Sequence, residues 1–339
     1  MKTFAITNWQ KIVAATVTLT TITFTTNPAA AELLRGAGDS FAEPLYQRYS
    51  KEYEQQTGEK FKYTLVGSGG GIRLFTNKSV DFAGTSLIPT PIEQNQIEDG
   101  LLIVPTGGGA IAIVYNLKNV NTDVKLSRDT LAKIFTGQIS NWQQVNPRFP
   151  NRKIQVVVNA ESSSTSFTLT KYLRKITGGK IEASRKPNWG FNVFASVNQD
   201  SAIAGEVKRV DGAIGYVQTS FARRNNLRIA QIENRAGRYV EPTLKDIEKA
   251  LATIKFNDDF STEDIIDPED GYPLVSLSWL LFSKQYPNQA LLERNRNLLT
   301  WIMTDGQKFN RELEYTKIPE DVANKIIETA KTEMRVRPF

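Results

Sequence analysis

The chain has 339 residues and a formal net charge of +6, and its mean hydropathy of −0.34 is too polar for an integral membrane protein. It has no cysteine, which excludes disulfides, thiolate metal sites and a lipid-modified cysteine at the mature N-terminus. It has no histidine either, which excludes a Ser-His-Asp triad, a histidine general base and histidine-ligated metals. This composition favours binding over catalysis, and we expect no catalytic residue, no metal and no cofactor.

The first 31 residues predict a secretory signal peptide. Lys2 and Lys11 give a positive start, residues 12–24 are apolar although rich in Thr, and the segment ends in three alanines that suit a cleavage site. The alternative is an amphipathic or buried N-terminal helix. Cleavage would remove both lysines and lower the formal charge from +6 to +4. The remaining charges are interspersed, which indicates a solvated surface and no nucleic-acid partner.

Helix and strand patterns alternate along the rest of the chain, which predicts an α/β fold. In chain order we expect a helix over 41–57, a strand over 61–66, a short helix over 72–78, strands over 80–83, 101–104 and 110–115, a helix over 131–135, a strand over 154–158, a helix over 167–176, strands over 212–217 and 274–282, and helices over 298–309 and 322–334. The glycines at 107–109 suit a bulge, a tight bend or a crossing between two lobes. The mature chain is long enough for two lobes with separate cores.

Three of the expected helices begin at clusters of small hydroxyl and glycine residues. These clusters are residues 36–41, 67–71 and 161–167. A helix start carries unpaired backbone N–H groups and the positive end of the helix dipole. Small residues let an oxyanion approach those donors. One such start is an ordinary N-cap, but three together predict convergence on a single multiply charged anion.

The three clusters, together with residues 80–86 and 211–217, resemble the periplasmic phosphate-binding protein family of the high-affinity phosphate ABC transporter. The matches fall in the family's order over nearly the whole mature chain, and the serine-rich third cluster resembles the cyanobacterial branch. The resemblance implies a type II periplasmic binding protein fold, in which two α/β lobes enclose a ligand cleft. Residues 1–31 would be the signal peptide. The lobe boundaries would then be 32–106 plus 274–339 for lobe one and 107–273 for lobe two.

The resemblance also implies which groups hold phosphate. Hydroxyl and backbone N–H groups at the three helix starts would donate to the anion, as neutral donors that still allow its later release. Taken alone, each of these Ser or Thr residues is more often an N-cap than a ligand. The implied donors are Ser40 and Phe41 at the first start, Ser68 at the second, and Ser163, Ser164 and Thr165 at the third.

Two further site positions depart from the family. Ser86 stands where the family has an Asp that accepts the phosphate proton and repels fully ionised sulfate. Asn159 stands where the family has an Arg, and Glu161 replaces the Asp that holds that Arg. A hydroxyl accepts more weakly than a carboxylate, and an amide donates more weakly than a guanidinium. We therefore expect weaker phosphate binding and less strict exclusion of sulfate, unless Arg73 or Lys78 supplies charge.

The resemblance implies a secreted solute-binding protein that captures inorganic phosphate and delivers it to a membrane ABC permease. It would be a periplasmic monomer and not an enzyme, and an uncleaved signal would hold it at the inner membrane. One alternative is a receptor for sulfate, arsenate or another tetrahedral oxyanion. Another is a phosphate-status sensor or adhesive protein without transport. A secreted phosphatase or serine hydrolase is disfavoured, because a nucleophilic serine needs an activating base. The chain has no histidine, and the third cluster contains no lysine.

Overall fold

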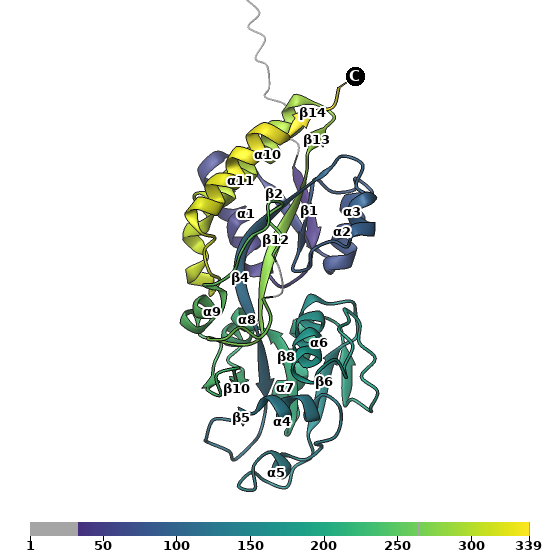
Figure 1. Ribbon diagram of the computed structural model, residues 1–339, viewed down its shortest axis with the longest axis vertical. Coiled ribbons are helices and arrows are strands. Elements are labelled where there is room, and N and C mark those ends of the chain that lie inside the picture. The colour runs from purple at the N-terminus through teal and green to yellow at the C-terminus, as the bar shows by residue number, and fades with distance from the viewer. Residues whose placement is uncertain (1–32, 263–264, 339) are drawn as a thin grey trace, which may run out of the picture. The chain divides into compact units, whose positions relative to one another are not determined.

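The computed structural model describes residues 33–262 and 265–338, and the chain from Leu33 onward forms one compact unit. The predicted signal peptide lies outside the described residues. Helices and strands alternate along the described chain, which confirms the α/β prediction (Figure 1). No helix within those two described ranges is both long and apolar enough to cross a membrane.

The strands are β1 (Leu34–Gly38), β2 (Phe61–Leu65), β3 (Phe82–Thr85), β4 (Leu101–Tyr115), β5 (Lys125–Leu126), β6 (Gln155–Asn159), β7 (Ala195–Val197), β8 (Ala213–Gln218), β9 (Arg228–Ile229), β10 (Gln231–Glu233), β11 (Tyr239–Val240), β12 (Val275–Ser283), β13 (Gln285–Tyr286) and β14 (Arg335–Val336). The helices are α1 (Glu43–Thr57), α2 (Ser68–Thr76), α3 (Pro91–Asn95), α4 (Arg128–Ile134), α5 (Trp142–Val145), α6 (Ser164–Ile176), α7 (Gln199–Arg209), α8 (Thr219–Arg224), α9 (Leu244–Leu251), α10 (Gln289–Met303) and α11 (Glu320–Glu333), with 3₁₀ segments η1 (Gly306–Phe309) and η2 (Arg311–Leu313).

One mixed sheet passes through the unit in the order β2-β1-β3-β12-β4-β8-β6-β7, with β9 beside β4. The first part of β4 pairs antiparallel with β12, and its last part pairs antiparallel with β8. We call β1, β2, β3, β12 and the β12-paired part of β4 the β1 half, and β6, β7, β8 and the rest of β4 the β6 half. In the β1 half, β1 pairs in parallel with both β2 and β3. In the β6 half, β6 pairs in parallel with both β7 and β8. Helices α10 and α11 pack against each other beside the β1 half (Figure 1).

The glycines at 107–109 lie inside a single strand, so the prediction of two separate strands, over 101–104 and 110–115, is wrong. Strand β4 is 15 residues long and stays paired with β12 through the glycines, with a register shift between Ser278 and Trp279. A Cβ at Gly108 would lie 2.1 Å from Leu251 Cδ1. Glycine is therefore used here for close packing against α9, and the strand continues from one half of the sheet into the other.

Helix α1 confirms the helix predicted after the first cluster. Its buried face carries Leu45, Tyr46, Tyr49 and Tyr53, at the spacing of an amphipathic helix. Gly58 ends it in the left-handed conformation, with φ of 76°, which glycine adopts at little cost. This packing fixes the direction of α1, and with it the position of the loop that precedes its N-terminus.

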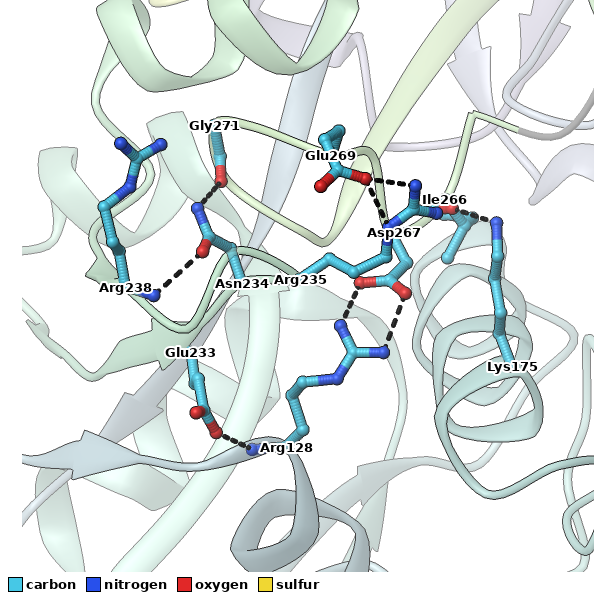
Figure 2. Close-up of polar contacts among 10 residues, drawn as sticks. All are labelled: Arg128, Lys175, Glu233, Asn234, Arg235, Arg238, Ile266, Asp267, Glu269 and Gly271. Atoms are coloured by element: carbon cyan, nitrogen blue, oxygen red, sulfur yellow. Dashed lines mark hydrogen bonds and ion pairs between the residues drawn. The ribbon is translucent and has the colours of Figure 1, made fainter.

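The segment that returns the chain to β12 is held by polar contacts (Figure 2). Arg128, at the start of α4, forms two parallel hydrogen bonds to the carboxylate of Asp267, one of them 2.8 Å long. Lys175 Nζ donates to the backbone oxygen of Ile266 at 2.7 Å, and Asn234 Nδ2 donates to that of Gly271 at 3.1 Å. These contacts tie residues 266–271 to α4, to α6 and to the turn after β10 before the chain enters β12.

Candidate functional site

A cavity of about 500 Å³ lies where the N-terminal ends of several helices meet. Its wall comes from the β1–α1 loop, the start of α2, the β6–α6 loop and the start of α7. Each of these helices follows a strand of the sheet within a few residues. The loops at the carboxyl ends of such strands are the usual place for a ligand in an α/β fold. Of the implied ligand residues, Ser40, Ser68, Asn159, Ser163 and Ser164 line this cavity.

The first helix start is shaped by a close backbone approach. A Cβ at Gly38 would lie 1.9 Å from the backbone oxygen of Gly84, and Asp39 N donates to that same oxygen at 3.2 Å. The N-cap of α1 is Ala42, which offers no side-chain acceptor to the first turn. Ser40 lies at the cavity, whereas the Phe41 side chain is fully buried in the core. Glu43 N donates to the backbone oxygen of Ser40 at 3.3 Å and Pro44 has no N–H, so backbone donors here would have to come from the first cluster itself and not from the first turn of α1.

The second helix start also has no side-chain cap. The N-cap of α2 is Gly67, with φ of 74°, and the helix opens with Ser68 and three glycines. Ser68 Oγ donates to Asp39 Oδ2 at 2.9 Å, so its hydroxyl proton is already engaged. The backbone N–H groups of the first turn of α2 are left for a ligand.

The third helix start is capped by its own serine. Ser163 Oγ accepts from Ser166 N at 3.3 Å and lies 2.7 Å from Thr165 Oγ1. Asn159 Oδ1 accepts from Glu161 N at 2.9 Å, which leaves the amide nitrogen of Asn159 to donate elsewhere. Ser163 is thus an N-cap in the ordinary sense and a cavity residue as well.

Three implied ligand residues lie outside the cavity wall. Phe41 is in the core, and its backbone oxygen accepts from Tyr315 Oη at 2.6 Å. Thr165 is buried within the first turn of α6. Ser86 is buried at the end of β3, and its Oγ has no hydrogen-bond partner among the described residues. It lines a second hollow of about 420 Å³.

The most unusual group of the cavity is the carboxylate of Asp39, which the sequence interpretation passed over within the first cluster. Asp39 is among the residues that line the cavity, although only 2 % of it is exposed. Burial raises the pKa of Asp39, and the nearby Ser86, Ser68 and Ser164 partly oppose that shift. Oδ1 has no hydrogen-bond partner within the described chain. An acidic residue inside an otherwise small, neutral helix start was the signal that could have found it.

Charged side chains at the cavity rim differ from those considered from the sequence. Arg73 lines the cavity from α2, and Glu161 lines it from the β6–α6 loop. Lys78 does not, because its ammonium group pairs with Glu98 at 2.8 Å and Asp99 at 3.3 Å. Of the two basic residues proposed as replacement charge, only Arg73 is placed to act on a ligand.

Helix α7 contributes a fourth start that the sequence did not assign to the site. Gln199 lines the cavity and adopts a left-handed conformation, with φ of 68°. The next residue, Asp200, is buried and accepts from Gln218 N at 2.7 Å. Burial is the main reason that the pKa of Asp200 is raised to about 6, and the Asp39 and Glu43 carboxylates add to it. The N-cap Asn198 makes no side-chain cap.

Comparisons with known proteins agree on the kind of molecule. A family model described as the PBP superfamily domain matches residues 23–305. The phosphate-binding protein PstS of Haemophilus influenzae is 30 % identical over 334 residues, covering 94 % of this chain and 97 % of that protein. The structure of a high-affinity periplasmic phosphate-binding protein (PfluDING) bound with phosphate superposes with a TM-score of 0.76 at 18 % identity, covering 88 % of this chain and 93 % of the other.

A second solved structure has the same fold. It is a protein from Clostridium perfringens assigned as a phosphate ABC transporter substrate-binding protein, with bound phosphate. Its TM-score is 0.64 at 17 % identity, and the match covers 84 % of this chain and 99 % of that one. These likenesses confirm the two-lobed periplasmic binding fold expected from the sequence.

Proposed function

The chain belongs to the PstS family of phosphate-binding proteins within the PBP superfamily, and we propose that it captures inorganic phosphate in the cavity and delivers it to an ABC permease. The observation that carries this proposal is the meeting of four helix starts at one cavity, three of them without a side-chain cap. Unpaired N–H groups and aligned helix dipoles stabilise a multiply charged oxyanion without a full countercharge.

The donors to phosphate are assigned as follows. Ser40, Ser163 and Ser164 donate through hydroxyl or backbone N–H groups. Ser68 donates through its backbone, because its hydroxyl is bonded to Asp39. Asn159 donates through its amide nitrogen. Phe41, Ser86 and Thr165 make their contacts only after the two halves close further on the anion.

We place the lobe boundaries where the sequence suggested, with 32–106 and 274–339 in lobe one and 107–273 in lobe two. A change of partner along β4 supports a division inside this strand, although it falls a few residues after 106, since the strand leaves β12 after Ala110 and pairs with β8 from Ile111. Phosphate in the cavity contacts helix starts from both halves. Its binding therefore favours a closed arrangement, and the closed form is the one that docks on the permease.

The protein acts as a periplasmic monomer that binds its ligand without converting it. Secretion would use residues 1–31. The absence of histidine supports binding over hydrolysis, since no His is available to activate a serine. A phosphate sensor without transport remains the competing function, and it differs only in what the closed form contacts.

Phosphate uptake tests the transport function. A host strain from which the gene has been deleted is supplied with either the wild-type chain or the Asn159→Asp variant, and uptake of labelled phosphate is measured at low external phosphate. We expect the wild-type chain to restore uptake and the variant to restore little. Uptake that is equal with and without the chain, while the purified protein still binds phosphate, would contradict transport and support the sensor.

A further inference from the structure

An ion pair between α3 and the segment that follows α6 joins the two halves of the sheet. Arg185 Nη1 lies 3.2 Å from Glu93 Oε1, and only 25 % and 28 % of the two side chains are exposed. Glu93 lies between β3 and β4 of the β1 half, whereas Arg185 lies between α6 and β7 of the β6 half. We call this ion pair the α3 pair. Neither of its residues lines the cavity, so the direct binding of phosphate does not explain it.

Glu93 is held within the β1 half by the capping box of α3. Its Oε2 accepts from Thr90 N at 2.7 Å and from Thr90 Oγ1 at 2.9 Å, which leaves Oε1 for Arg185. Burial alone would raise the pKa of Glu93, but the hydrogen bonds from Thr90 and the charge of Arg185 outweigh burial and lower that pKa. Ile97, just after α3, belongs to the same buried cluster as Phe75 of α2. The carboxylate is therefore ionised, oriented and attached to the β1 half.

Arg185 is attached by its backbone to the third helix start. Its carbonyl oxygen accepts from Ser163 N at 2.8 Å, and Ser163 is both the N-cap of α6 and a cavity residue. The preceding residue, Ser184, donates its N–H to Thr170 Oγ1 of α6 at 3.0 Å. The guanidinium reaches the other half, since a Cβ at Gly69 in the first turn of α2 would lie 3.9 Å from Nη1. The side chain therefore extends from the third helix start to the second.

A second ion pair between the halves has a different position. Arg223 of α8 lies 2.8 Å from Glu314, and these side chains are 34 % and 31 % exposed, much as in the α3 pair. Glu314 lies beside β4, because Thr316 N donates to the backbone oxygen of Gly108 in that strand at 2.8 Å. Groups beside the strand that the halves share move little when the halves turn about it. The α3 pair instead joins elements on either side of the cavity, so opening the cavity separates its charges.

We propose that the ion pair between Glu93 and Arg185 stabilises the arrangement in which the two halves enclose the anion and thereby slows the release of phosphate. This inference rests on the proposed function, because it concerns how the same cavity keeps its ligand. Both are positioning residues, since they act through the second and third helix starts and not on the anion. Loss of the pair leaves the donors in place and disfavours the enclosing arrangement, so the dissociation rate changes most.

The rate of phosphate release tests the proposal. The phosphate-loaded mature chain is mixed by stopped flow with an excess of a fluorescent phosphate scavenger. Glu93→Gln removes the charge, and glutamine still serves in a capping box. We expect this variant to release phosphate at least about threefold faster than the wild type, since a partly exposed ion pair contributes modestly. The matched control is Glu314→Gln, which makes the same change beside β4 and should release phosphate at the wild-type rate.

Salt gives a readout that a merely structural role of Glu93 would not move. Ions screen a partly exposed pair, so the difference in release rate between the wild type and Glu93→Gln should shrink as salt is added. Thermal unfolding without phosphate should be the same for both proteins. A difference in release rate that salt leaves unchanged would contradict an electrostatic contact between the halves.

The sign of the effect separates this role from simple attraction of phosphate by Arg185. If Arg185 acted only as a positive charge near the cavity, removing the Glu93 carboxylate would strengthen that attraction and slow release. In the double variant Glu93→Gln with Arg185→Gln, we expect release to be slower than the product of the two single effects predicts, because both substitutions break one contact.

Three results would overturn the proposal. They are release from Glu93→Gln that is unchanged or slower, an equal acceleration in Glu314→Gln, and single effects that multiply fully in the double variant. A wild-type chain that binds no phosphate would instead contradict the proposed function.

Discussion

Neutral donors at the cavity are oriented by bonds that their other atoms make. Ser163 Oγ caps α6, Ser68 Oγ donates to Asp39, and Asn159 Oδ1 accepts from the backbone of Glu161. A side chain that is held in this way loses little freedom when a ligand arrives, so its remaining donor is available at low entropic cost. The site is therefore preorganised residue by residue before phosphate enters.

Asn159 offers a direct test of its assigned role. In Asn159→Asp, one carboxylate oxygen can still accept from Glu161 N, while the donating nitrogen becomes a negatively charged acceptor. We expect phosphate binding to weaken at least about tenfold, or 1.4 kcal/mol. The matched control is Asn188→Asp, because Asn188 Oδ1 accepts from Gly190 N in an equivalent turn that is exposed to solvent. An affinity loss of the same size in both variants would contradict the assignment.

Asp200 predicts a pH effect on stability. Burial disfavours the charged form and raises its pKa in the folded protein from the ordinary 3.8 to about 6. Below about pH 4 the carboxyl is neutral in both states, so it costs nothing. Between these two values the folded state binds the proton more strongly, and stability falls as pH rises. Above about pH 6 the full cost of the buried charge is present.

The Asp200→Asn variant should remove this cost. Relative to the wild type, we expect it to gain on the order of 1–3 kcal/mol between about pH 4.5 and pH 7.5. Thermal unfolding at the two pH values measures the change. The control is Asp258→Asn, whose carboxylate is fully exposed. A difference between Asp200→Asn and wild type that does not change with pH would refute the argument.

At the scale of elements, strong periodicity predicted most of the fold. The apolar face of α1, the strand that became β8 and the closing helix α11 all fall within a few residues of their predicted positions. The failures have physical causes. Strand β4 continues through its glycines because β12 pairs with them, and long-range pairing leaves no local signal. Helix α9 is different, because Leu244, Ile247 and Leu251 stand at helical spacing and Thr243 caps the helix, so its local signal was present and was overlooked.

The ion pair between Arg128 and Asp267 predicts how firmly the return segment is held (Figure 2). The Asp267 side chain is only 2 % exposed, so removing its charge leaves a poorly solvated guanidinium. We expect Asp267→Asn to destabilise the protein by about 3 kcal/mol. The backbone at this position is left-handed, with φ of 57°, and asparagine tolerates that conformation. The substitution therefore adds no backbone strain to the measured loss of stability.

The same segment supplies the control for that prediction. Arg235 bonds to Glu269, but both side chains are about half or more exposed. We expect Arg235→Ala to cost less than about 1 kcal/mol, since exposed ion pairs contribute little. Urea unfolding gives both values, provided that the slope with denaturant is unchanged. Equal losses in the two variants would show that burial does not decide the strength of these contacts.

At the scale of the whole molecule, part of the site could be predicted and part could not. The three clusters are far apart in sequence, yet the structure brings all three to one cavity, as the shared pattern indicated. Asp39 was missed because sequence alone does not reveal that a carboxylate is buried with an unpaired oxygen. Gln199 was missed because its position depends on a left-handed turn before α7. Both depend on packing between distant elements.

The halves of the sheet share β4, so a ligand that contacts both can change how they lie relative to each other. Phosphate would replace solvent among the helix starts and link the β1–α1 loop to the β6–α6 loop. A ligand shifts such an equilibrium only by its difference in affinity for the two arrangements. The delivery of phosphate to a permease therefore depends first on tight, specific binding in the cavity.

Calorimetric titration of the mature chain with phosphate, after any bound anion has been removed, tests the central claim most directly. We predict saturable binding of one phosphate per chain, with a dissociation constant in the micromolar range or below. The Asn159→Asp variant should bind more weakly under the same conditions. No saturable binding by the wild-type chain, or binding that Asn159→Asp leaves unchanged, would contradict the assignment of the cavity as the phosphate site.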